Sequence, residues 1–278
     1  IQNDTLISSN SNNFLSEIFD LSFKNDYEYY INKSFSLNFG IDAIYHIYKP
    51  AEISFFLQEE NLIKSDTTFS SSETNSYEAA FYVDVKLQIS NRIKSNLGVR
   101  INNYTYQQTN FISYEPRILT NFRLTKTSAI KLSYTYLEQN VHMLSFSGMG
   151  TYSDLWVPAT INTPPAKINQ GAIGYEKDFW TNKFNLQIEA YYKKMSNLLD
   201  FGYGTFWNNA INWEEKSEKN GFGKAYGIEF FVTKKTGKLT GWIGYTFSKS
   251  KRQFENINSG KWYDYDYDRP IDFKVFAN

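Results

Sequence analysis

The stretch KWYDYDYDRPID, residues 261–272, holds the most closely spaced set of groups that could do chemistry. Three aspartates occupy alternate positions in it: Asp264, Asp266 and Asp268. A calcium-binding loop begins with this spacing, and one face of a β-strand has it too. An EF-hand loop needs glycine at its sixth position and glutamate at its twelfth, where this chain has Arg269 and Val275. The sequence therefore favours an extended loop that enters a strand, and it predicts no metal site.

Tryptophans in polar segments are the second set of candidates, because large rings on exposed loops can stack on sugars or on aromatic ligands. They are Trp156, Trp207, Trp213 and Trp262. Each ring has an alternative role, either in packing loop against loop or in a belt of rings at a membrane interface.

The two histidines are weaker candidates for ligand or metal contact. His142 closes a predicted strand just before a long polar segment, and His46 lies at the end of another. Neither has a second metal ligand at a useful spacing. The sequence therefore favours a hydrogen-bonded histidine at a strand end in both cases.

Composition excludes several classes of chemistry. The chain has no cysteine, so it has no disulfide, thiol nucleophile or cysteine-bound metal. Its 29 basic and 29 acidic residues balance, so no broad basic face indicates nucleic acid. No Ser/His/Asp arrangement, phosphate-binding glycine loop or metalloprotease motif is present. We therefore expect neither an enzyme nor a cofactor.

The elements that must position these residues are strands, since apolar residues recur with period two. In 77–89 one face is apolar and aromatic while the other carries Glu78, Asp84 and Lys86. Aromatic residues make up 18% of the chain although its mean hydropathy is −0.50, which fits rings outside and water inside. Eleven strands are predicted, roughly at 14–30, 34–49, 76–90, 94–108, 113–126, 129–142, 167–179, 183–199, 222–235, 239–251 and 270–278.

The connections between these strands alternate in length. Short turns near residues 31–33, 91–93, 126–128, 181–182 and 236–238 alternate with longer segments near 50–75, 143–166, 200–221 and 252–269, except for a brief link near 109–112. Short periplasmic turns and long extracellular loops are typical of an outer-membrane barrel. We therefore expect an all-β, transmembrane antiparallel β-barrel, with a soluble β-sandwich as the alternative. No apolar run is long enough for a membrane helix, and the first residues predict a mature or internal fragment without a signal peptide.

Several segments, in this order, resemble TonB-dependent outer-membrane receptors, particularly those of the Bacteroidetes. One segment is GKAYGIEFFVTKKTGKLTGWIGYTFSKSKRQFENINSGKWYDYDYDRPIDFKV (223–275), with a G-x-A-Y-G-I-E strand start and a Y-D-R-x-x-D element. The others are YEPRILTNFRLTKTSAIKLSYTYLEQNVHMLS (114–145), LWVPAT (155–160) and IEAYYKKMSNLLDF (188–201). In family terms Tyr267, Asp268, Arg269 and Asp272 open a strand, and Arg269 with the aspartates would form an ion-pair network at the lumen wall.

The resemblance implies a 22-stranded barrel closed by a plug domain. Such a receptor imports a scarce substrate (siderophore, haem, vitamin, peptide or glycan) through the bacterial outer membrane, on energy relayed by TonB, ExbB and ExbD. Eleven strands cannot close that barrel. We therefore expect residues 1–278 to be part of one barrel domain, a fragment that lacks the plug domain, the TonB box and the C-terminal strands.

The expected partners are outer-membrane lipid, the TonB system acting through the plug, a surface lipoprotein and the substrate. Other functions stay open at this point. A passive porin-like channel, a structural barrel and a component of an outer-membrane complex would all share this strand pattern.

Overall fold

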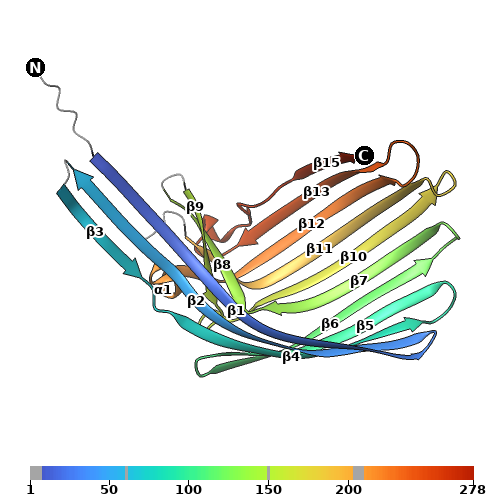
Figure 1. Cartoon of the computed structure of the whole chain (residues 1–278), viewed down its shortest axis with the longest axis horizontal. Coiled ribbons are helices and arrows are strands. Elements are labelled where there is room, and N and C mark those ends of the chain that lie inside the picture. The colour runs from blue at the N-terminus through green and yellow to red at the C-terminus, as the bar shows by residue number, and fades with distance from the viewer. Residues whose placement is uncertain (1–7, 60–61, 149–150, 203–209) are drawn as a thin grey trace, which may run out of the picture.

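In the computed structural model, which describes residues 8–59, 62–148, 151–202 and 210–278, the chain forms one long antiparallel sheet curved into a trough (Figure 1). The eleven principal strands are β1 (Ser8–Asn32), β2 (Phe35–Glu59), β4 (Thr74–Gln88), β5 (Ile93–Tyr106), β6 (Thr109–Arg123), β7 (Ser128–Gln139), β10 (Ala166–Phe179), β11 (Phe184–Phe201), β12 (Ser217–Lys234), β13 (Gly241–Gln253) and β15 (Ile271–Ala277). They are hydrogen-bonded in chain order, with β15 beside β13. All eleven predicted strands are thereby confirmed. Among the described residues the sheet is open, because β1 and β15 do not pair.

The segments predicted as long loops contain structure of their own. They hold β3 (Leu62–Ser70), which pairs with β2, and a separate hairpin of β8 (Val141–Gly148) and β9 (Thr151–Pro158). They also hold a short helix α1 (Trp213–Lys216), a 3-10 turn η2 (Asn258–Gly260) and β14 (Tyr263–Asp264). Figure 1 shows the short turns gathered at one end of the sheet and these additions at the other. None of the helical segments in the described residues has the length and apolarity of a membrane-spanning helix.

Alternation along the strands gives the sheet two chemically different faces. The outer face exposes large apolar side chains on every principal strand: Phe23, Ile41, Phe81, Ile101, Ile118, Leu132, Ile173, Tyr192, Phe230, Phe247 and Phe273. The strand register places these side chains in continuous rows, as where Phe81 lies opposite both Ile41 and Ile101. An exposed apolar surface of this extent requires a nonaqueous environment, and a bilayer provides it.

Rings mark both edges of the apolar part of the outer face. At the short turns, Trp180 packs against Phe184 with ring centroids 5.0 Å apart. Towards the loop end, Tyr192 of β11 stacks on Tyr226 of β12 at 6.5 Å. The nine residues from Phe184 to Tyr192 span about 26 Å along the strand, within the nine to eleven residues of a tilted membrane strand. The two groups of rings therefore have the spacing of two interfacial belts.

A compact apolar cluster closes the loop end. It joins β2, the β8–β9 hairpin, the end of β11 and the region of α1, and its buried members are Ala51, Ile53, Leu144, Leu155, Val157, Leu199, Phe201, Ala210 and Trp213. We call the hairpin together with α1 the loop cap. Strands that are far apart in the sheet are connected through it, since β2 and β11 are separated there by five strands.

Candidate functional site: the inner face and the loop cap

Charged residues of both signs line the inner face of the sheet in a connected network. Arg100 of β5 lies 3.1 Å from Asp42 of β2 and 3.6 Å from Glu78 of β4. Glu78 also accepts a hydrogen bond from Asn140 at 2.8 Å, and Nε2 of His46 lies 3.9 Å from it. These side chains come from three different strands and from the link between β7 and β8, and they point to the same side, so their charges are matched across the wall.

His46 has the environment of a structural histidine. Its Nδ1 atom lies 2.7 Å from Asp20 on β1, and its Nε2 atom is buried without a hydrogen-bond partner among the described residues. No group of three or more histidine and carboxylate side chains in the described part of the chain could hold a metal ion.

Two glycines allow the inner network to continue towards the short turns. Arg117 of β6 pairs with both carboxylate oxygens of Asp84 on β4, passing over Gly98 of β5 between them. A Cβ atom at Gly98 would collide with the Asp84 carboxylate and with the guanidinium of Arg117. In the same way Gly40 leaves room for Tyr82, whose hydroxyl donates to Asp26. A bidentate arginine pair of this kind is geometrically specific, and glycine is the residue that permits it.

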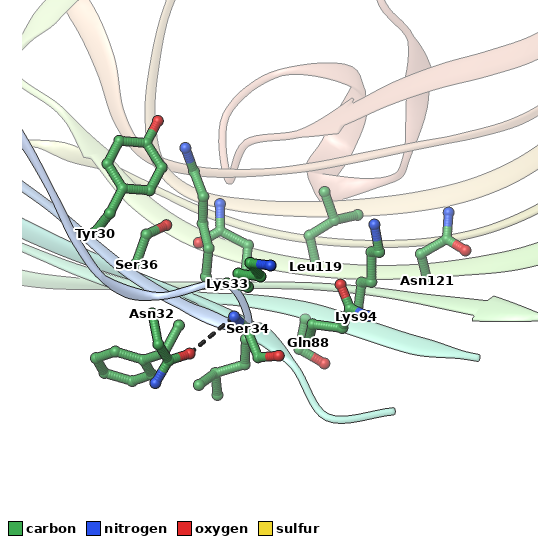
Figure 2. Close-up of a pocket in the computed structure, with 14 residues that line it drawn as sticks. Tyr30, Asn32, Lys33, Ser34, Ser36, Gln88, Lys94, Leu119 and Asn121 are labelled. Carbon is green, nitrogen blue, oxygen red and sulfur yellow. Dashed lines mark hydrogen bonds between the residues drawn. The ribbon is translucent and has the colours of Figure 1, made fainter. Parts of the chain in front are cut away.

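A hollow of about 610 Å³ lies on the inner face at the short-turn end (Figure 2). Its lining includes three lysines, Lys33, Lys86 and Lys94, of which Lys86 is paired with Glu28 at 2.8 Å. Amide and hydroxyl groups such as Asn121 and Ser34 also line it, together with apolar side chains such as Leu119. In Figure 2 the side chains of Lys94 and Asn121 rise from the sheet on the same side. The hollow therefore combines basic groups with apolar side chains and has room for a ligand or a segment of chain.

Polar contacts also hold the loop cap and the segment that follows β9. Glu214 of α1 accepts hydrogen bonds from the Thr160 hydroxyl at 2.6 Å and from Asn162 at 3.0 Å. The Tyr104 hydroxyl, on the inner face of β5, donates to the carbonyl of Ala159 at 3.3 Å. The buried side chain of Tyr104 thus fixes the segment after β9 to the wall, in addition to the apolar cluster.

The tryptophans predicted to contact a ligand differ in their environments. Trp213 is 8% exposed inside the apolar cluster, and Trp156 on β9 is 36% exposed beside β1, where its backbone N–H donates to Ser16. Trp262 lies on the outer side, with the ammonium of Lys224 4.2 Å from its ring centre. Trp207 is outside the described residues. Ligand contact by these rings stays a prediction, and Trp156 is the one whose exposure suits it.

The aspartate stretch makes its contacts with lysines. Lys249 of β13 lies 2.7 Å from Asp264 and 2.9 Å from Asp268, while Asp272 pairs with Lys274. The chain turns at residues 265–268 instead of running extended, since the Asp268 N–H donates to the Tyr265 carbonyl. Arg269 contributes its carbonyl to Ser248, and Asp266 is exposed. We expected Arg269 to form a network with these aspartates at the lumen wall. In the structure Lys249 is the partner of Asp264 and Asp268 instead, and the alternation along β13 places Lys249 on the outer face.

The intervening tyrosines instead join the stretch to the loop cap and to β11. Tyr267 donates a hydrogen bond to Asp154 on β9 at 2.8 Å, and Tyr263 donates to Asp200 on β11 at 3.1 Å. The Asp200 carboxylate also accepts a hydrogen bond from Arg252. The guanidinium of Arg252 lies 3.6 Å from the centre of the Tyr265 ring. Burial still raises the pKa of Asp200, although Arg252 and Tyr263 oppose that shift.

His142 makes the stability of the loop cap depend on pH. Burial lowers the pKa of His142 from 6.5 to about 4, while its ring donates to the Pro164 carbonyl at 3.2 Å. Because the folded pKa is below the unfolded one, protons bind preferentially to the unfolded cap. We expect the cap to be fully stable above about pH 6.5 and to lose roughly 3 kcal/mol as the pH falls towards 4.

Hydrogen exchange of residues 141–158 at several pH values measures this loss. The variant His142→Gln retains a hydrogen-bond donor but does not titrate in this range, so its cap should exchange with little additional pH dependence. Equal pH dependence in the two proteins would show that another group controls the cap.

Sequence reasoning missed both the inner network and the cap hairpin. The charges at positions 78, 84 and 86 indicated a wet face, but the register that pairs β4 with β2 and β5 is not visible in one sequence. The hairpin did have a signal, since apolar residues alternate in both its arms, as at Leu144 and at Leu155 with Val157.

A family model described as "TonB dependent receptor-like, beta-barrel" matches residues 2–270. Among solved structures, the FrpB iron transporter from Neisseria meningitidis is 12% identical, with a TM-score of 0.59 over 87% of this chain and 37% of that one. The Pseudomonas aeruginosa FpvA complex with pyoverdine is 12% identical, with a TM-score of 0.58 over 97% and 36%. The RagAB peptide transporter is 10% identical, with a TM-score of 0.57 over 92% and 32%. No curated protein sequence matches. The chain therefore spans about a third of these structures, and the similarity shows a shared fold.

Proposed function

Because the chain belongs to the TonB-dependent receptor-like β-barrel family, we propose that it forms part of the wall of an outer-membrane receptor that imports a scarce substrate. The substrate would be captured at the loop end and released inward on energy relayed by TonB, ExbB and ExbD. The protein itself would do no covalent chemistry.

The observation that carries this proposal is the combination of an apolar outer face with a charged inner face closed at one end by a folded cap. The apolar face suits lipid, and the paired charges of the inner face suit a hydrated passage. A cap that connects β2 with β11 would restrict free diffusion through such a passage. Restricted diffusion favours uptake that requires energy over passive leakage.

The class of substrate stays open among siderophores, haem, vitamins, peptides and glycans. The solved structures include one named for iron, one bound to a pyoverdine and one named for peptides. The exposed ring of Trp156 and the surface of the loop cap are where we would place first contact, and a surface lipoprotein could cover the same end.

Uptake by cells tests the proposal. The full-length protein is produced in a bacterium, which is grown with a panel of ferric siderophores, haem, cobalamin, peptides and oligosaccharides, each as the limiting nutrient. We expect growth on at least one compound to require both this protein and an intact tonB gene. Growth that persists without TonB would contradict active import.

A passive channel is the second candidate, favoured by the hydrated character of the inner face. It predicts steady conductance of the purified full-length protein in a planar bilayer without any energy source. A silent bilayer together with TonB-dependent growth would exclude it.

A further inference from the structure

Three lysines lie directly opposite one another at the loop end of β11, β12 and β13. Lys194 is the register partner of Lys224, and Lys224 is the register partner of Lys251. Like charges directly opposite on neighbouring strands destabilise a sheet. The row therefore has a local electrostatic cost that an anion would remove.

The row faces outward, on the side of the apolar outer face. Side chains two residues apart on a strand point to the same side, and Lys194 follows the exposed Tyr192 by two residues. Likewise Lys224 precedes the exposed Tyr226 by two residues. The stacked pair of Tyr192 and Tyr226 thus lies two residues from the lysines in the direction of the short turns, at the edge of the apolar surface.

Acidic side chains of the protein compensate this charge only at one end. Asp264 lies 3.6 Å from Lys251, but it is closer to Lys249, at 2.7 Å. Lys224 lies against the ring of Trp262, and no carboxylate forms an ion pair with Lys194 or Lys224 among the described residues. The middle and the β11 end of the row are left without an anion.

We propose that the row of Lys194, Lys224 and Lys251 binds the phosphorylated headgroup of a lipid in the leaflet at the loop end. Its acyl chains would lie on the outer face below Tyr192 and Tyr226, while the lysine ammonium groups extend upward to phosphate. Trp262 supplies an interfacial ring at the same height. This inference rests on the membrane placement in the proposed function, but it does not depend on transport.

Lipid binding to the purified full-length protein in a neutral detergent tests the proposal. Native mass spectrometry compares three probes: diphosphorylated lipid A, phosphatidylcholine and inorganic phosphate. We expect lipid A to bind in preference to phosphatidylcholine, and the triple variant K194Q/K224Q/K251Q to bind it on the order of tenfold more weakly. The triple variant K194R/K224R/K251R, which keeps the charge, should bind like the parent protein.

Three exposed lysines at the opposite end provide the matched control, K126Q/K183Q/K238Q, which removes the same charge. If the control variant weakened lipid A binding equally, the effect would come from net charge alone, and the proposed site would be wrong. Full displacement by millimolar inorganic phosphate would identify a free-anion site instead of a lipid site. Because the measurement needs no uptake, its failure leaves the proposed transport function intact.

Discussion

Phe81→Arg is expected to lower the free energy of unfolding from a bilayer by about 2–4 kcal/mol. Phe81 is half exposed in the middle of β4, and its register partners are the apolar Ile41 and Ile101. An arginine there would have to hold its charge in hydrocarbon or distort the lipid around it. Urea titration of the full-length protein folded into lipid vesicles, followed by tryptophan fluorescence, measures the difference.

A pair of adjacent residues on β11 provides the control for this prediction. Ile188 points outward and Gln187 points inward, where its amide donates to Asn185 at 2.9 Å. We expect Ile188→Arg to be destabilising to a similar degree, and Gln187→Arg to cost much less because its charge would remain in water. Equal losses from both variants would mean that the outer face does not contact lipid.

Trp213→Ala is expected to destabilise the loop cap by about 3–5 kcal/mol while leaving the strands of the wall in place. The ring is 8% exposed and packs in the cluster with Leu155 and Val157, which are fully buried. Its removal leaves a cavity that the surrounding backbone cannot fill. Protease digestion of folded protein in detergent should cut the β8–β9 hairpin much faster in the variant.

Trp156→Ala separates this packing role from a role in ligand contact. Trp156 belongs to the same cap but is 36% exposed, so its loss should change cap stability by no more than about 1 kcal/mol. If the ring contacts substrate, this variant should lose uptake at unchanged cap stability. Rapid digestion of both variants would contradict the difference in packing that the structure shows.

The wall of this protein was predictable from sequence because one face of each strand had to be apolar. The alternation that identifies residues 77–89 as a strand also identifies which side chains face outward. Strand ends were less certain. The structure extends β1 and β2 to 25 residues each, well beyond the predicted 14–30 and 34–49. The first residues of β1 are all polar, and Pro50 interrupts the pattern of β2, so neither extension has a clear alternation.

The candidate site was less predictable, because it depends on distances along the chain that sequence patterns do not contain. Arg117 reaches Asp84 from a strand two places away, and only Gly98 between them makes that contact possible. The aspartate stretch shows the same limit. Its sixth and twelfth positions argued against an EF-hand loop, but its contacts, with Lys249 and through Tyr267 with Asp154, depend on how β13 and β9 meet.

In the proposed outer-membrane placement, the unusual length of β1 and β2 has a consequence for how far the protein extends from the cell surface. Twenty-five residues extend about 80 Å, whereas about nine to eleven suffice to cross the hydrocarbon. In the proposed orientation the loop-end halves of this hairpin would extend well beyond the membrane, with Asn10 and Leu57 paired near its tip. Antibodies and phage tails, which are too bulky to approach the lipid surface closely, would then contact this extended hairpin first.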